Sequence, residues 1–130
     1  MYTLPDDFDL LLLSGCYLEM VSFAAATTRL DFSRPQVNPG MTAYGVSICV
    51  EGGLKYKLAD VSGSREFTDS STCAPLIDFL LKDVLSIEKL SGSTLRIIFI
   101  SGDKIIIEGD SCHDYELYTI YLDTGDIIIV

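Results

Sequence analysis

Residues 93–109, STLRIIFISGDKIIIEG, constrain the fold of this 130-residue chain more than any other stretch. Two runs rich in isoleucine flank a Ser-Gly-Asp turn. β-Branched residues favour strands, whereas Gly and Asp favour tight turns. The pattern therefore predicts a β-hairpin with strands over residues 95–100 and 104–108.

The first half of the chain contains a fainter copy of this hairpin and of the strand before it. The copies align at an offset of 67 residues, which becomes 57 after the proline-containing loop at residues 33–40. Both halves also place a helix before a meander, which favours a duplicated unit over a coincidental likeness between amphipathic strand pairs. The matched pairs are Leu18 with Leu85, Met20 with Ile87, Phe23 with Leu90, Thr27 with Thr94, Arg29 with Arg96, Leu30 with Ile97, Phe32 with Phe99, Ile48 with Ile105, Val50 with Ile107, Glu51 with Glu108 and Gly52 with Gly109.

The copies differ at two positions on the outward face of one strand. Ile98 and Ile100 stand where the first copy has the polar residues Asp31 and Ser33. A strand that is apolar on both faces must be covered on both. The sequence therefore predicts that a helix, a second sheet or a partner chain covers the two isoleucines.

Two short helices are predicted, at residues 5–14 and 74–81. Pro5 followed by two aspartates is typical of a helix start, and Gly15 is typical of a position just past a helix end. The Ser-Thr pair at residues 71–72 offers an N-cap for the second helix.

Alternation of apolar and polar residues predicts nine strands in the rest of the chain. Leu18 and Met20 are expected to share one face of the first strand. A Gly-Gly pair predicts a hairpin between residues 44–51 and 54–58, and the polar stretch at 60–73 predicts a connector. The predicted strands cover residues 16–23, 27–32, 44–51, 54–58, 84–90, 95–100, 104–108, 115–122 and 127–130.

These elements predict a single α+β domain over residues 1–130, mostly antiparallel β-sheet with two short helices. The helix–β-meander units are pseudo-duplicated, in halves of about 5–59 and 74–130, and they form one or two sheets whose apolar faces the helices cover. A domain of this size buries roughly two thirds of the surface of its unfolded chain, which suffices for a core without disulfides. The four cysteines are expected to be reduced thiols, because no secretory signal precedes them.

The net charge of −10 bears on the class of partner. An acidic surface repels nucleic-acid backbones and anionic membranes, and it attracts basic proteins. Residues 103–130 contain seven of the acids and one lysine, so they account for −6 of the −10. No run approaches the ~18 apolar residues of a membrane helix, and we expect a soluble, cytoplasmic protein.

No motif indicates catalysis or a cofactor. The one histidine, His113, lies between Cys112 and Asp114, and neighbours in an extended chain point to opposite faces and rarely share a metal. The chain has neither a GxGxxG motif nor a P-loop. We therefore expect a non-enzymatic protein without metal or cofactor, and an enzyme that uses His113 is the lowest-ranked alternative.

The acidic C-terminal third is the predicted partner-binding surface. Its acids fall mostly at turns and strand ends, and tyrosines, which are enriched at interface centres, are interleaved with them. The alternative is a solvated acidic surface with the tyrosines in the core. The predicted contact residues are Asp103, Glu108, Asp110, Asp114, Tyr115, Glu116, Tyr118, Asp123 and Asp126.

The second half, roughly residues 84–130, combines the Ser-Gly-Asp turn, the run at residues 105–110, Tyr115-Glu116 and residues 118–120. With these features it resembles small bacterial immunity proteins of polymorphic-toxin and contact-dependent growth inhibition systems. The resemblance implies a protein that binds a cognate toxin, often a basic nuclease, and blocks it. We therefore expect an acidic inhibitor of a basic toxin. The alternative is a structural or assembly domain that forms homo-oligomers through an apolar sheet face.

Overall fold

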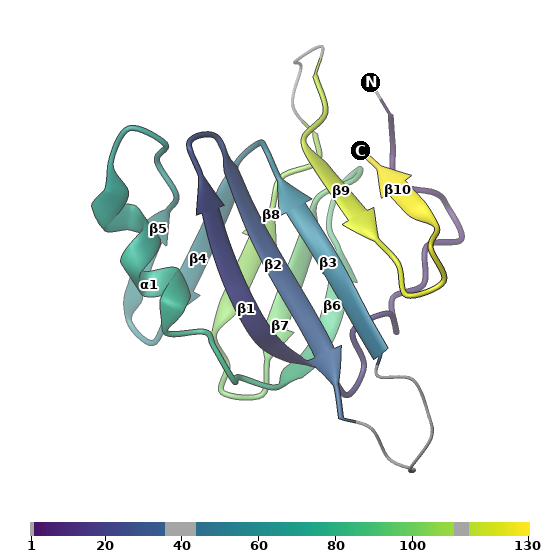
Figure 1. Ribbon diagram of the computed structural model, residues 1–130, viewed down its shortest axis with the longest axis horizontal. Helices are drawn as coiled ribbons and strands as arrows, with labels where there is room; N and C mark the ends of the chain where they lie inside the picture. The colour runs from purple at the N-terminus through teal and green to yellow at the C-terminus, as the bar shows by residue number, and fades with distance from the viewer. Residues whose placement is uncertain (1, 36–43, 111–114) are drawn as a thin grey trace.

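The computed structural model of the protein describes residues 2–35, 44–110 and 115–130 (Figure 1). Its strands form two five-stranded antiparallel sheets that pack face to face, in agreement with the predicted antiparallel architecture. The first sheet has the order β1-β2-β3-β9-β10, and the second has the order β5-β4-β8-β7-β6. The strands are β1 (Tyr17–Ala24), β2 (Thr27–Arg34), β3 (Tyr44–Val50), β4 (Leu54–Leu58), β5 (Val61–Ser64), β6 (Val84–Lys89), β7 (Leu95–Phe99), β8 (Lys104–Ile107), β9 (Tyr118–Tyr121) and β10 (Ile127–Ile129).

Each sheet combines a three-stranded meander from one half of the chain with a hairpin from the other half. The predicted hairpin between residues 44–51 and 54–58 is wrong, because β4 pairs with β5 and β8 in the second sheet and not with β3. The chain crosses between the sheets at Gly52. There the amides of Glu51 and Gly52 donate to the carbonyl of Leu117, and the amide of Glu108 donates to the carbonyl of Gly53.

The core lies between the inward faces of the two sheets. Leu30, Ile48 and Ile120 form one row across the first sheet, and Ile97 pairs with Ile105 in the second. All five side chains are at most 1% exposed. Burial of a side chain of this size contributes about 1.5–3 kcal/mol, so these rows fix the strand register.

A β-bulge in β1 overturns the expected alternation in this strand. Leu18 pairs with Phe32, but Met20 pairs with the next residue of β2, Asp31. Leu18 is buried and Met20 is 51% exposed, so the two do not share a face. An extra residue in one strand shifts every later side chain to the other face, and no residue of this strand indicates the bulge in advance.

A second bulge lies in β6, between Val84 and Ser86. Val84 pairs with Phe99 and is buried, as Leu18 is in β1, whereas Leu85 is 62% exposed. In the register of the two sheets, Leu18 of β1 therefore corresponds to Val84 of β6, one residue short of the predicted offset of 67. The second and third strands keep the offsets of 67 and 57 in their register.

The predicted helix at residues 5–14 is wrong. This segment forms successive turns, in which Phe8 donates to the carbonyl of Pro5 and Leu12 to that of Asp9. The carboxylate of Asp9 also accepts from the amide of Leu11 at 2.9 Å, a local bond that competes with helix formation. Gly15 does end the segment, with a left-handed φ of 74°.

The second predicted helix is shorter than expected. A 3₁₀ turn, η1 (Ser70–Cys73), leads into the single turn of α1 (Ala74–Ile77), and the cap is Asp69 rather than a residue at 71–72. Phe79, which follows α1, is buried against Phe99 with ring centroids 5.2 Å apart. The stretch 60–73, expected to be a connector, also contains β5. Across residues 2–35, 44–110 and 115–130, no helix has the length and apolarity to span a bilayer.

Candidate functional site

The structure divides the predicted contact residues between opposite ends of the sandwich, because successive turns of an antiparallel meander alternate between ends. Asp103 lies in the β7–β8 turn and is only 7% exposed. Its carboxylate accepts from the hydroxyl of Ser101 and the amide of Ala59, and it lies 3.0 Å from the ammonium of Lys82. The hydrogen bond from Ser101, followed by that from Ala59, lowers the pKa of Asp103 to about 2. Its carboxylate therefore has a structural role within the protein.

Tyr118 also belongs to the interior. Its ring is 1% exposed, and its hydroxyl donates to the carbonyl of Ser93 at 2.6 Å. Burial raises the pKa of this hydroxyl well above its ordinary value. This position in the core rules out the prediction that Tyr118 anchors a partner.

Asp110 closes the β6–β7 turn at the other end. Its carboxylate accepts from the amide of Ser93 at 2.7 Å and from the hydroxyl of Thr94 at 2.8 Å. It lies so close to Gly92 that a Cβ there would stand 2.0 Å from a carboxylate oxygen, and Gly92 also has a φ of 64°. Glu108, Tyr115 and Glu116 are exposed at the same end. Asp114, like Cys112 and His113, lies outside the described residues.

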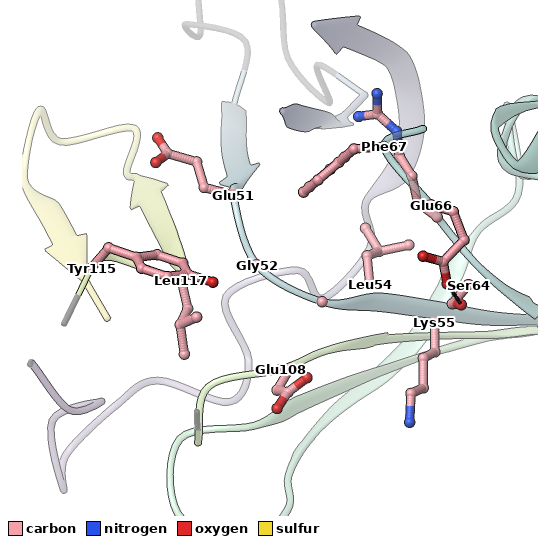
Figure 2. A pocket seen from close by; sticks show the side chains of 12 residues that line it. Glu51, Gly52, Leu54, Lys55, Ser64, Glu66, Phe67, Glu108, Tyr115 and Leu117 are labelled. Atoms are coloured by element: carbon pink, nitrogen blue, oxygen red, sulfur yellow. Dashed lines mark hydrogen bonds between the residues drawn. The ribbon is translucent and has the colours of Figure 1, made fainter. Parts of the chain in front are cut away.

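A pocket of about 330 Å³ opens at this end, where β3 crosses to β4 (Figure 2). We call it the crossover pocket. Tyr115 and Leu117 lie on one side of the crossover and Phe67 lies on the other. Arg65 has a structural role here, because its guanidinium donates hydrogen bonds to the carbonyls of Ala24 and Thr27. The lining residues are Glu51, Gly52, Gly53, Leu54, Lys55, Ser64, Arg65, Glu66, Phe67, Glu108, Tyr115 and Leu117.

A second pocket, of about 390 Å³, lies between the N-terminal segment and the β9–β10 hairpin. Four aspartates surround an apolar floor, and the described lining residues include no lysine or arginine. We call it the acidic pocket. Its acids are Asp7, Asp9, Asp123 and Asp126, and its other lining residues are Pro5, Phe8, Leu12, Tyr44, Leu122, Thr124 and Ile128.

Hydrogen bonds connect the walls of the acidic pocket. The hydroxyl of Tyr44 donates to the carbonyl of Leu12 at 2.7 Å and so ties β3 to the N-terminal segment. The carboxylate of Asp123 accepts from the amide of Gly45 at 3.4 Å, which links the hairpin to β3. Desolvation raises the pKa of Tyr44, so its hydroxyl stays protonated and available as this donor. The pocket is therefore a built part of the fold.

The chemistry of the acidic pocket suits a cationic side chain. Carboxylates pair with ammonium and guanidinium groups, and an apolar floor packs against their methylene stems. A metal is a poorer match, since no group of three or more His, Cys, Asp or Glu residues in the described part of the chain could hold one. The guanidinium carbon of Arg34 lies 4.1 Å from the centre of the Tyr44 ring, which lines the pocket.

Asp123 and Asp126 were among the predicted contact residues, but the N-terminal half of the acidic pocket was not. Asp6 and Asp7 were assigned to the first turn of a helix, where acids interact favourably with the helix dipole, and Asp9 was given no role. Asp7, Phe8 and Asp9 instead line the pocket. The alternation of acids with an aromatic residue was the signal that could have identified them.

Comparisons of the chain with family models, curated proteins and solved structures found no match. The geometry of its own residues is therefore the basis for assigning it a function.

Proposed function

We propose that the protein is a non-enzymatic binding protein that holds a basic segment of another protein in the acidic pocket. The observation that carries the proposal is the combination of four carboxylates with an apolar floor in one cavity. A lysine or arginine side chain matches both parts, because its stem packs on apolar surface while its charge pairs with carboxylates. The net charge of −10 favours fast encounter with such a partner.

The resemblance to immunity proteins narrows the partner to a cognate basic toxin, with nucleases as one class that fits the charge. Binding would neutralise the toxin in the cytoplasm by occluding it. Glu108, Tyr115 and Glu116, at the other end of the sandwich, are exposed but lie apart from the acidic pocket, so the proposal assigns them no primary role.

Co-expression with the product of an adjacent reading frame, followed by co-purification, tests the proposal. We expect a complex that Asp123→Asn combined with Asp126→Asn weakens at least about tenfold, because both charges face the pocket. Asp60→Asn combined with Asp78→Asn removes the same charge from two exposed positions outside the pocket, so it should leave the affinity unchanged. Equal affinities for the two double variants, or neighbouring products that are neither toxic alone nor bound, would contradict the proposal.

The outer face of the first sheet supports a second candidate function, assembly of the protein with itself. Met20, Tyr121 and Ile127 are each more than 40% exposed on this face. Its charge is low, because the Arg29 guanidinium donates to the Asp31 carboxylate at 3.0 Å, and the Glu19 carboxylate, which accepts from Ser33, carries the remaining charge. Two copies of a chain with a net charge of −10 can approach most closely at a face of low net charge.

Sedimentation velocity separates this candidate from the first. A dimer built on this apolar face should persist in about 1 M salt, where exposed ion pairs are screened beyond about 3 Å. Ile127→Asp should convert it to a monomer. Val61→Asp is the matched control, since Val61 is 59% exposed on β5 of the other sheet. A monomer at all concentrations would remove the candidate.

We also propose that the two halves of the chain are copies of one five-stranded unit. The strand orders of the two sheets support this. In the first sheet the meander β1 to β3 lies beside the hairpin β9–β10, and in the second the meander β6 to β8 lies beside the hairpin β4–β5. The bulges in β1 and β6, near equivalent positions, support it as well.

A further inference from the structure

The outer face of the second sheet carries a concentration of cations that is unusual for this chain. Lys55 and Lys57 alternate along β4 with the buried residues Leu54 and Tyr56, so they point away from the core. Register continues the outward rows across the sheet. One row is Lys55, Ile106, Arg96 and Glu88, and the next is Lys57, Lys104, Ile98 and Ser86.

We call these two rows the basic face. It contains four of the nine lysines and arginines in a protein with 19 acidic residues. Arg96 is paired with Glu88, but Lys55, Lys57 and Lys104 form no ion pair within the described part of the chain. The fold therefore presents uncompensated positive charge on one face of an acidic molecule.

Lys57 and Lys104 are directly opposite each other on neighbouring strands. Like charges in this position destabilise a sheet. An uncharged residue that favours strands, such as threonine, could occupy either position without this repulsion. The pair therefore lowers the stability of the isolated protein. A ligand with negative charge would relieve the repulsion when it binds.

Aliphatic side chains accompany the lysines. Ile98 and Ile106 are half-buried within the rows, and Leu85 and Ile100 beside them are 62% and 66% exposed. No aromatic side chain belongs to the two rows. Single-stranded nucleic acids are held chiefly by stacking on aromatic residues, whereas aliphatic patches suit protein partners.

We propose that the basic face binds a protein segment in which acidic residues alternate with aliphatic ones. In such a segment, acids would pair with Lys57 and Lys104 while the aliphatic residues pack on Ile98 and Ile106. Glu108 and Asp110 line a hollow of about 280 Å³ at one end of the face together with Lys55. Their carboxylates would repel acidic residues of the ligand, so we expect those residues to bind nearer Lys57 and Lys104, at the other end. This proposal is independent of the acidic pocket and concerns a partner of opposite charge.

Fluorescence anisotropy with a labelled peptide of alternating Glu and Leu tests the proposal. We expect the peptide to bind the wild-type protein more tightly than a matched peptide of Gln and Leu, and to be released as salt is raised. Lys104→Glu should weaken binding at least about tenfold, because it replaces a favourable pairing by a repulsive one. Lys89→Glu makes the same charge change at an exposed position outside the two rows, so it should bind the peptide nearly as well as the wild type.

Measuring the Tm of the variants separates loss of binding from loss of folding. Lys104→Glu places opposite charges across from each other, at positions 57 and 104, so its Tm should equal or exceed that of the wild type. Loss of binding would then not result from unfolding. The proposal is wrong if Lys104→Glu and Lys89→Glu bind the acidic peptide equally, or if the neutral peptide binds as tightly as the acidic one. Tighter binding of an oligothymidine than of the acidic peptide would overturn it in favour of a nucleic-acid ligand.

Discussion

The acidic pocket and the basic face are charged regions of opposite sign, and they arise from different parts of the architecture. The pocket takes its acids from turns and from the N-terminal segment, where the backbone is free of sheet pairing. The basic face takes its lysines from alternate positions of paired strands. Charges in turns are gathered by whichever turns meet at one end of the sandwich, whereas charges in strands are gathered by register. Only the second kind follows directly from local sequence periodicity.

The same comparison explains why acids that are close in sequence have different roles. Asp103 is hydrogen-bonded and buried in the β7–β8 turn, whereas Asp126 is exposed in the β9–β10 turn. The environment of each turn, and not the density of acids along the chain, decides which carboxylates are open to a partner.

The largest expected effect separates these two kinds of acid. Asp103→Asn should lower the free energy of unfolding by about 2 kcal/mol at pH 7, because its pKa of about 2 lies below the unfolded value of 3.8 and one pKa unit corresponds to about 1.4 kcal/mol. A group whose pKa is lowered by folding stabilises the fold above its unfolded pKa. That contribution is lost as the pH falls from about 4 toward 2. Urea denaturation of both proteins at pH 7 and pH 2 measures it.

Asp126→Asn is the matched control for that prediction. Its carboxylate is exposed and accepts a bond only from Thr124, at 3.1 Å, among the described residues. The unfolding free energy should therefore change by less than about 0.5 kcal/mol, as for most exposed substitutions. A loss as large as that of Asp103→Asn would remove the distinction between structural and open acids.

A smaller effect concerns the basic face. Lys104→Thr should raise the free energy of unfolding by about 0.2–1 kcal/mol, the range for cross-strand pairs, because it removes the repulsion from Lys57. The gain should shrink in high salt, where the repulsion is screened. Thermal unfolding at low and high salt measures both. A variant that is less stable than the wild type at low salt would show that the lysine pair does not strain the sheet.

The smallest expected effect concerns the acidic pocket. Asp7→Asn combined with Asp123→Asn should raise the free energy of unfolding by a few tenths of a kcal/mol at low salt, because it reduces repulsion among four exposed carboxylates. Binding of a basic partner should weaken in the same variant. A variant that is more stable but binds the partner more weakly would support the pocket as a binding site. Unchanged stability and unchanged affinity would argue against it.

Sequence periodicity predicted the strands well where a strand buries one face and contains no bulge. Val46, Ile48 and Val50 alternate with Ser47 and Cys49 along β3, and all three are at most 1% exposed. The antiparallel class followed from the same patterns. Bulges are set by how strands fit against their neighbours, so the exposed position of Met20 could not be derived from its own sequence.

The candidate site was harder to predict than the strands, because it depends on contacts between distant segments. Asp123 and Asp126 were identified from the acidity of the C-terminal third, but Asp7 and Asp9 are held near them by contacts of the N-terminal segment with distant strands, such as the bond between Tyr44 and Leu12. The pairing of β3 with β9, which positions the hairpin, is likewise a long-range event. Local patterns show which residues are acidic, and tertiary pairing decides which of them meet.

The exchange of hairpins between the two halves has a consequence for how the protein folds during synthesis. β3 cannot acquire its neighbour β9 until some 70 residues later in the chain have been made, and β4 likewise waits for β8. Until then the nascent first half exposes open strand edges on β3 and β4, which are prone to pairing with other chains. Completion of the two sheets is therefore a late, concerted event, and ribosome-bound intermediates that stop before β8 should be protease-sensitive throughout.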